Sequence, residues 1–353
     1  MRVLVLMFWS ALLANSVAAQ EVPAPRGAKI VSPDARLELL FTRSASIAGG
    51  LTEGPAVAAD GSIYFTDIPF GKDDGMILRF DPASGQTATF SFESGKANGL
   101  VFDAKGNLLA CEGAGGGGRR VSRYNIHTGQ RTTVVDNIGG KKFNAPNDLC
   151  HDSKGRIYFT DPRYVGTESR DLKHRAVYRI DTDGSVHELT HQVTKPNGIA
   201  ISPDGKTLYV ADHDNGTDNI DPNAPPPKQR VMKIYSFPLA ADGTVGKRRT
   251  IVDFGEEKGC DGMTVDAEGH IYLTIRCNRR PGVLVIDPDG LQVAHIPTGP
   301  ANQKPTKARG PVGLPSNVEF GRGAGANYLY VTVDKSLYRI RLKVKGHFVQ
   351  YDD

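Results

Sequence analysis

The segment from Lys195 to His213 reads "KPNGIAISPDGKTLYVADH", and its arrangement recurs along the chain. A polar residue precedes a short apolar run, a turn with Asp and Gly follows, and an aromatic-rich run comes last. "APNDLCHDSKGRIYFTDP" from Ala145 to Pro162 and "GCDGMTVDAEGHIYLTIR" from Gly259 to Arg276 keep this order. Two apolar runs joined by such a turn indicate a β-hairpin. We therefore expect the chain to consist of repeated hairpins.

The glycines of the hairpin turns give the period of the repeat. They lie at intervals of 45, 49, 50, 64 and 56 residues, at Gly61, Gly106, Gly155, Gly205, Gly269 and Gly325. Such a period is typical of a solenoid, a propeller or another array. Each hairpin is followed by a further strand and turn, so each unit supplies about four short strands and no long helical pattern.

Four short strands per unit match one blade of a β-propeller. The predicted fold is all-β, a six-bladed β-propeller over residues 35–353, in which the early strand from Ala35 to Thr42 completes the last blade. Two stacked sheets are the alternative, but a sandwich gives no reason for six similar units.

The first 19 residues are typical of a secretory signal. A basic Arg2 precedes the apolar run "VLVLMFWSALLA", and small residues at Val17 and Ala19 suit cleavage. A membrane anchor is the alternative, but the run is too short to span a bilayer. The sequence predicts a secreted or periplasmic protein in which residues 20–34 form an extension before the propeller.

The charge pattern excludes nucleic acid as an expected partner. The formal net charge is +4, with both signs interspersed and no zinc-finger or recognition-helix pattern. No later apolar stretch is long enough to span a membrane, and the oligomeric state is not indicated. The expected partner is a small molecule.

One cysteine pair has a geometric case for a disulfide. If the hairpin around Gly269 pairs Met263 with Thr274, then Cys260 and Cys277 are cross-strand partners as well. Two free buried thiols are the equal alternative. Cys111 and Cys150 have no such argument.

Polar residues occur eight positions before each turn glycine, at Glu53, Asn98, Asn147, Asn197, Asp261 and Asn317. Equivalent positions at the starts of inner strands meet at one end of a propeller channel, which predicts a ring of oxygen atoms there. The alternative is that Asx residues simply cap turns. An oxygen ring without His or Cys favours Ca²⁺ over Mg²⁺, disfavours Zn²⁺, and leaves another divalent cation as a variant.

The phrases "LTEGPAV", "NAPNDL", "KPNGIAISPDGKTLYVAD" and "CDGMTVDAEGHIYLT" resemble, in this order, the senescence-marker-protein and gluconolactonase family of six-bladed propellers. The resemblance covers roughly Leu51 to Ile340. It implies that Glu53, Asn197 and Asp261 hold a calcium ion, with Asn147 as a further ligand or substrate contact.

The resemblance also implies hydrolysis of sugar lactones and related esters, with Asp261 as general base through a held water. A calcium ion with open positions could polarise the lactone carbonyl and stabilise the oxyanion. No "GxSxG" elbow is present, which favours direct attack by water. A triesterase acting on organophosphates and a non-enzymatic carbohydrate- or protein-binding propeller with structural calcium are the alternatives.

Further candidates follow the second strand of each blade. Substrate contacts are predicted at Asn98, Asn147, Asp161, Tyr164, Asp212 and Arg276, with Glu112 and His213 as secondary candidates. Structural hydrogen bonding is the alternative for each of them, and solvation is favoured for His213. The run Gly113 to Gly118 lacks a phosphate-loop context and is expected to be a flexible loop. The acidic, proline-rich insert at 213–229 is expected to be a lid, with a second calcium site as the alternative.

Overall fold

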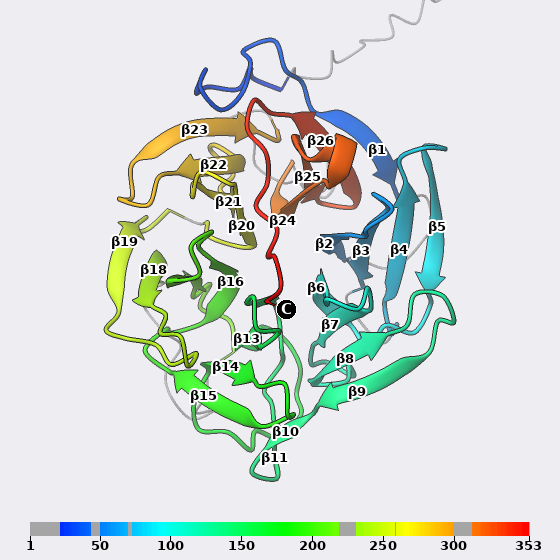
Figure 1. The fold of residues 1–353 in the computed structure, drawn as a ribbon, viewed down its shortest axis with the longest axis vertical. Helices are drawn as coiled ribbons and strands as arrows, with labels where there is room; N and C mark the ends of the chain where they lie inside the picture. Colours follow the sequence, from blue (N-terminus) through cyan, green and yellow to red (C-terminus); the bar gives the residue numbers. More distant parts are fainter. Residues whose placement is uncertain are drawn as a thin grey trace, which may run out of the picture.

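Six four-stranded antiparallel sheets stand in a ring around a central channel in the computed structural model, as Figure 1 shows. The structure describes residues 22–43, 50–69, 73–218, 231–257, 259–299 and 313–352. The six-bladed β-propeller is thereby confirmed. The predicted signal segment, residues 1–19, and most of the insert lie outside the described residues.

The first three blades follow the chain in order, each with its innermost strand first. Blade 1 contains β2 (Leu51–Val57), β3 (Ile63–Ile68), β4 (Met76–Asp81) and β5 (Gln86–Ser91). Blade 2 contains β6 (Ala97–Phe102), β7 (Leu108–Glu112), β8 (Arg120–Tyr124) and β9 (Arg131–Val135). A small ribbon of β10 (Asn137–Ile138) and β11 (Lys141–Lys142) precedes blade 3, which contains β12 (Leu149–His151), β13 (Ile157–Asp161), β14 (Ala176–Ile180) and β15 (Val186–Thr190).

The other three blades repeat the pattern, and the last one joins both ends of the chain. Blade 4 contains β16 (Pro196–Ile201), β17 (Thr207–His213), β18 (Met232–Pro238) and β19 (Arg249–Asp253). Blade 5 contains β20 (Met263–Val265), β21 (Ile271–Ile275), β22 (Gly282–Ile286) and β23 (Gln292–Pro297). Blade 6 contains β24 (Pro315–Phe320), β25 (Tyr328–Val333), β26 (Ser336–Arg341) and the early strand β1 (Glu38–Thr42), with the 3-10 helix η1 (Gly323–Gly325) in its hairpin.

The predicted closing strand is confirmed, because β1 pairs antiparallel with β26. Residues of the extension also pack on the ring: Arg26 pairs with His295 of β23, and Ile30 and Val31 are buried in the core between blades 5 and 6. Among the described residues, no helix is long and apolar enough to cross a membrane.

Hydrogen bonds from the two innermost strands of each blade to the inner strand of the next connect every pair of neighbouring blades. Threonine hydroxyls cross three junctions: Thr66 donates to the carbonyl of Asn98 at 3.0 Å, Thr160 to that of Asn197 at 2.8 Å, and Thr274 to that of Ser316 at 2.8 Å. The Ser316 hydroxyl crosses the closing junction by donating to the Thr52 carbonyl at 2.6 Å.

Blades 2 and 4 carry Cys111 and Ala211 where the other blades have this threonine. There a glycine N–H makes the bridge instead, from Gly99 to the Asn147 carbonyl at 2.7 Å and from Gly198 to the Asp261 carbonyl at 3.2 Å. All six junctions are therefore bridged at the same level of the channel.

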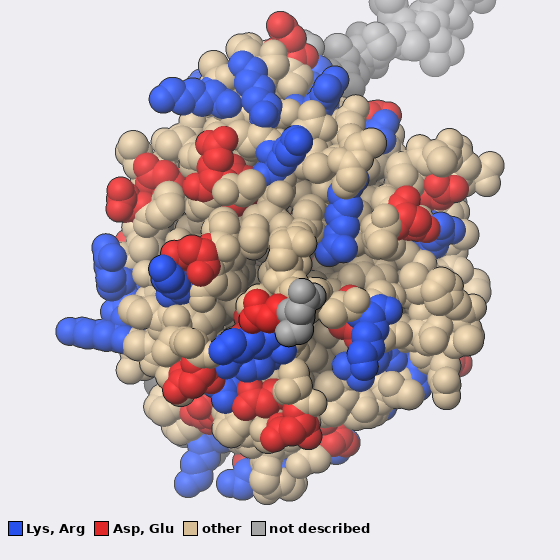
Figure 2. Space-filling model, viewed as in Figure 1, with Lys and Arg blue, Asp and Glu red and all other residues tan. Residues whose placement is uncertain are grey.

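The C-terminal segment crosses one end of the channel, as the red trace in Figure 1 shows. The His347 N–H donates to the Val265 carbonyl at 3.1 Å, Tyr351 stacks on His151 with ring centroids 5.0 Å apart, and the Asp352 N–H donates to the Ser153 carbonyl at 2.8 Å. On this face acidic and basic side chains are interspersed (Figure 2), in agreement with the charge pattern of the sequence.

The possible disulfide is absent, because all four cysteines are free thiols. The hairpin pairs Met263 with Leu273 rather than with Thr274, so the register differs by one residue from the predicted one. The Cys260 thiol instead donates to the Asp212 carbonyl at 3.1 Å, and the Cys277 thiol to Oε1 of Glu257 at 3.3 Å. A one-residue change of register turns side chains to opposite faces.

The bridge at the junction of blades 3 and 4 gives a stability prediction. Thr160 is fully buried, and its hydroxyl also accepts from the Asp148 N–H at 3.1 Å. Thr160→Val leaves both backbone groups without this partner, so we expect a loss of about 1–3 kcal/mol in the free energy of unfolding, measured by urea denaturation. Thr250→Val, at an exposed position of the outer strand β19, is the matched control. Equal stability of the two variants would contradict the structural role of the bridge.

Candidate functional site

A cavity of about 460 Å³ lies around the inner-strand starts, on the face opposite the C-terminal segment. Its lining includes five of the six predicted ring residues, Glu53, Asn98, Asn147, Asn197 and Asp261. They come from blades 1 to 5. Residues chosen by their spacing from the turn glycines, and far apart in the chain, therefore meet in one cavity. Such a concave site with a few converging polar groups has the size of a small-molecule pocket.

Glycines after the ring residues let neighbouring inner strands approach closely. A Cβ atom on Gly54 would lie 2.1 Å from the Asn98 carbonyl oxygen, and one on Gly198 would lie 2.4 Å from that of Asp261. A side chain at either position would push the ring apart. The "EG", "NG" and "DG" pairs of the sequence thus set the width of the ring.

Asn317 is a correction to the predicted ring. Its N–H donates to the Thr332 hydroxyl at 3.0 Å, as the Asp148 N–H does to Thr160. Asn317 therefore occupies the position after the ring residue, and Ser316 is the equivalent in blade 6. Both polar ends of Asn317 are in use, since Oδ1 accepts from the Val318 N–H at 2.8 Å and Nδ2 donates to Asp148 at 3.3 Å.

Counting back eight residues from Gly325 places the ring position of blade 6 at Asn317, one residue after Ser316. The five other turn glycines have positive φ, whereas in blade 6 it is Gly323 that has a φ of 58° and Gly325 ends the 3-10 helix. The turn of this blade is thus built differently from the others.

The carboxylates of the ring form an acidic centre. Glu53 and Asp261 are buried, and burial, followed by the nearby charge of Asp261, raises the pKa of Glu53 well above its usual range. Arg276 places a positive charge nearby, with its Nε 3.6 Å from Asp261 Oδ2, and Nδ1 of His213 lies 3.8 Å from Oδ1. Neither distance is that of a hydrogen bond.

The donor set fits a hard cation. Nδ2 of Asn197 donates to the Tyr164 hydroxyl at 3.0 Å, which leaves the amide oxygen of Asn197 as a free donor atom for a metal. A divalent ion stabilises two buried carboxylates that lie close together, and amide oxygens complete a donor set typical of calcium. Within the described ranges no three His, Cys, Asp or Glu side chains form a metal cluster, so the remaining oxygens of such a site would come from the amides.

Two predicted substrate contacts have a structural role instead. Asp161 accepts hydrogen bonds from the backbone of Asn144 and Ala145 at 2.8 and 2.5 Å. Asp212 accepts from Thr194 and Lys195, both at 2.8 Å. Each carboxylate holds the loop that leads into a ring asparagine and is absent from the cavity lining, so the structural alternative holds for both. Glu112 is likewise buried, with Arg120 Nε 2.9 Å from its Oε2.

Tyr164, Arg276 and Asn98 do line the cavity, as predicted, and so does His213. His213 was expected to be solvated, but its ring lies in the wall at 5.8 Å from that of Tyr164, and its Nδ1 is buried without a hydrogen-bond partner. Sequence reasoning missed Lys96 and Asn215, which also line the cavity. Lys96 directly precedes β6 with a positive φ of 54°, a backbone conformation that no strand pattern in the sequence indicates.

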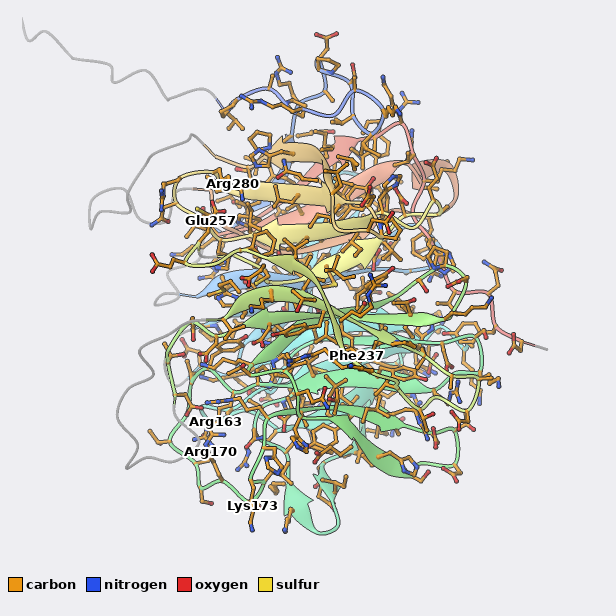
Figure 3. All side chains as sticks on the ribbon, turned by 90° about the vertical axis from the view of Figure 1, so that its left-hand side faces the viewer. Arg163, Arg170, Lys173, Phe237, Glu257 and Arg280 are labelled. Atoms are coloured by element: carbon orange, nitrogen blue, oxygen red, sulfur yellow. The ribbon has the colours of Figure 1, made fainter. Side chains whose placement is uncertain are left out.

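The glycine-rich run, predicted to be a flexible loop, makes a defined contact with a neighbouring loop. The N–H groups of Gly115 and Gly116 donate to Oε1 of Glu168 at 2.7 and 2.8 Å. Burial raises the pKa of Glu168, but these bonds and the nearby charge of Arg163 together outweigh it and lower the pKa below its usual value. In side view Arg163 and Arg170 lie toward the face away from the C-terminal segment (Figure 3). Loops of blades 2 and 3 are thus joined at the mouth of the cavity.

A sequence profile described as the SMP-30/gluconolactonase/LRE-like region matches residues 51–335. The chain belongs to this family. Among its similar proteins, the gluconolactonase of Zymomonas mobilis is 28% identical over 315 residues, covering 84% of this chain and 79% of that protein. The pentonolactonase XacC of Haloferax volcanii is 27% identical over 298 residues, covering 83% and 85%.

Solved structures agree with the sequence comparison. A gluconolactonase from Xanthomonas campestris is 28% identical, with a TM-score of 0.70 over 91% of this chain and 97% of that one. The family ring predicted from the resemblance, Glu53, Asn147, Asn197 and Asp261, is the set that this chain brings to one cavity.

A chamber of about 90 Å³ lies in the channel beyond the ring, lined by Asp148, Thr264, Glu319, Arg322 and His347 among others. Glu319 keeps some accessible surface because it faces this chamber, yet protein encloses it. Burial raises its pKa from 4.5 to about 7, although Phe320 N–H and the Thr264 hydroxyl donate to it. The folded protein therefore holds a proton there that the unfolded chain releases above about pH 4.5.

Glu319 gives a pH prediction for stability. Because the folded state binds more protons between about pH 4.5 and 7, the free energy of unfolding falls as pH rises through this window. We expect Glu319→Gln to gain about 2 kcal/mol relative to the unchanged protein between pH 5 and pH 8, measured by denaturant unfolding at each pH. A difference that stays constant with pH would contradict the raised pKa. Asp289→Asn, an exposed turn position, is the control.

Proposed function

We propose that this protein is a calcium-dependent hydrolase that opens lactones by direct attack of water. The observation that carries the proposal is the convergence of Glu53, Asn147, Asn197 and Asp261 on one cavity. Membership of a family that includes a gluconolactonase and a pentonolactonase supports the reaction class. Sugar lactones are the substrates suggested by these relatives.

Those four residues would hold the ion, with Tyr164 fixing the orientation of the Asn197 amide. When bound, calcium supplies a positive charge that polarises the lactone carbonyl and stabilises the developing oxyanion. Four protein ligands are fewer than the six to eight oxygens that calcium takes, which leaves room for water and substrate.

Asp261 is the proposed general base. Both of its oxygens face cationic or ionisable groups at distances too long for a hydrogen bond, so each can accept a proton from a water molecule in the cavity. Arg276 lies beside this carboxylate, with its Nε 3.6 Å from Asp261 Oδ2. Its Nη1 donates to the Pro315 carbonyl at 3.1 Å, which holds the guanidinium beside the carboxylate.

His213 is suited to positioning the attacking water. Its unpartnered Nδ1 lies near Asp261 Oδ1, and its backbone carbonyl accepts from the Tyr164 hydroxyl at 3.3 Å. Asn98 and Asn147 line the cavity wall and can donate amide hydrogen bonds to ring oxygens of the substrate. We also propose that the protein acts outside the cytoplasm, on the evidence of its first 19 residues.

Hydrolysis of D-glucono-1,5-lactone and a panel of other lactones tests the reaction. Activity is expected with calcium, to be lost with a chelator and to return when calcium is added. Asp261→Asn should lower kcat by about 10²- to 10⁴-fold because the general base is removed, while Asp289→Asn keeps activity. A folded, calcium-loaded protein with no activity on the panel would contradict the lactonase function. That result would favour a non-enzymatic binding propeller with structural calcium. Selective activity on phosphotriesters would favour the organophosphate alternative.

Calcium binding is tested separately from activity. An ion that binds only the folded state raises its stability, by about 2.7 kcal/mol at 100 times the Kd. We expect a concentration-dependent rise in Tm with CaCl₂, and Glu53→Gln should greatly reduce it because one of the two buried carboxylates is neutralised. Isothermal titration calorimetry checks the same loss. No change in Tm, together with no heat of binding, would exclude calcium from the ring.

A further inference from the structure

Apolar side chains line the mouth of the cavity above the oxygen ring on blade 1. Leu51 is two residues before Glu53 in β2, so it lies on the same side of the strand and one pleat repeat nearer the mouth. Ile68 is its cross-strand partner in β3, and Pro69 follows. All three line the cavity, and Leu51 and Ile68 keep part of their surface exposed.

A second apolar group comes from blades 2 and 3. Val165 lies in the loop after β13 and lines the cavity together with Ala114 and Pro146. Its side chain is 57% exposed, one of the few large apolar side chains of the described residues with such exposure, and the one among them that lines this cavity. An apolar ligand that covers this side chain removes it from water, which is favourable.

The loop that carries Val165 is fixed on both sides. Glu168 is held by the N–H groups of Gly115 and Gly116, and Arg163 Nη2 donates to the carbonyls of Gly166 and Glu168 at 2.9 and 2.7 Å. A Cβ atom on Gly166 would lie 2.7 Å from the Gly115 nitrogen, so the two loops touch through their glycines. The exposed valine is therefore positioned by the fold.

We propose that the natural substrate is a lactone with an apolar alkyl or aryl substituent, which packs between the Leu51–Ile68 group and Val165. This inference rests on the proposed lactonase function and specifies its substrate class. The hydroxyls of a polyhydroxylated substituent would lose water against these walls and find no partner there. An apolar substituent instead covers the Leu51–Ile68 group and Val165 and so shields them from water, which is favourable. The lactone ring of the substrate then occupies the polar side of the cavity near Asn147, His213 and Arg276.

The volume of the cavity agrees with this substrate class. About 460 Å³ lies within the range of about 300–1,000 Å³ that encloses drug-sized ligands. A bare six-membered lactone leaves the mouth unfilled, whereas a substituent of several carbons reaches the apolar walls. The polar side of the cavity would thus contact the reacting lactone ring, and the apolar side would bind the substituent.

Two lactones with the same six-membered ring provide the test, δ-nonalactone with its butyl substituent and D-glucono-1,5-lactone with its hydroxyls. The readout is the ratio of their kcat/KM values, each normalised to spontaneous hydrolysis. We expect the ratio to favour δ-nonalactone by at least about tenfold in the unchanged enzyme. Val165→Asn should lower the ratio about tenfold, mainly through a higher KM for δ-nonalactone.

Two further variants complete the design. Glu168→Gln removes the carboxylate charge with little change of shape, loosens the Val165 loop and should also lower the ratio. Leu291→Asn changes a side chain that is 66% exposed and absent from the cavity lining, and should leave the ratio unchanged.

The outcomes separate the two proposals. A ratio that favours D-glucono-1,5-lactone, or that Val165→Asn leaves unchanged, overturns the apolar substrate class while lactonase activity stands. No hydrolysis of either lactone by folded, calcium-loaded protein overturns the lactonase and this inference with it. Retention of Tm and the far-ultraviolet circular dichroism spectrum in Val165→Asn ensures that a lower ratio reflects recognition.

Discussion

The site depends on hydrogen bonds that run from the two innermost strands of each blade to the inner strand of the next blade around the channel. The carbonyls of Asn98, Asn147, Asn197 and Asp261 accept these bonds, so the backbone of each of these ring residues is fixed by its neighbouring blade. Burying polar side chains beside a cavity costs free energy because they lose hydrogen bonds to water. A backbone held this firmly keeps such side chains in one fixed arrangement despite that cost. The same contacts therefore close the propeller and position the proposed ligands.

The repeat was readable from the sequence because its causes are local. Turn glycines, alternating apolar residues and a constant inner-hairpin length place Glu53, Asn98, Asn147, Asn197 and Asp261 in equivalent positions. The β1 strand was readable for the same reason. Each of these signals lies within a few residues of the feature that it predicts.

The errors came from contacts between distant segments. The irregular turn of blade 6 displaced the count to Asn317, and a one-residue register change separated Cys260 from Cys277. Asp161 and Asp212 occur at the cavity end of their strands. Their hydrogen-bond partners are set by the loops that carry Ala145 and Lys195. The partial burial of His213 also depends on its packing against Tyr164. No local pattern encodes these choices.

The closing blade combines residues 38–42 with residues 315–341. During synthesis, the N-terminal strand emerges first but has no partner until nearly the whole chain has been made. The ring therefore closes through one of the longest-range contacts available to the chain, and such contacts form late in folding. Up to that moment the growing chain carries an unpaired strand edge, which is a hazard for aggregation, and the ring cannot close before β26 has been synthesised.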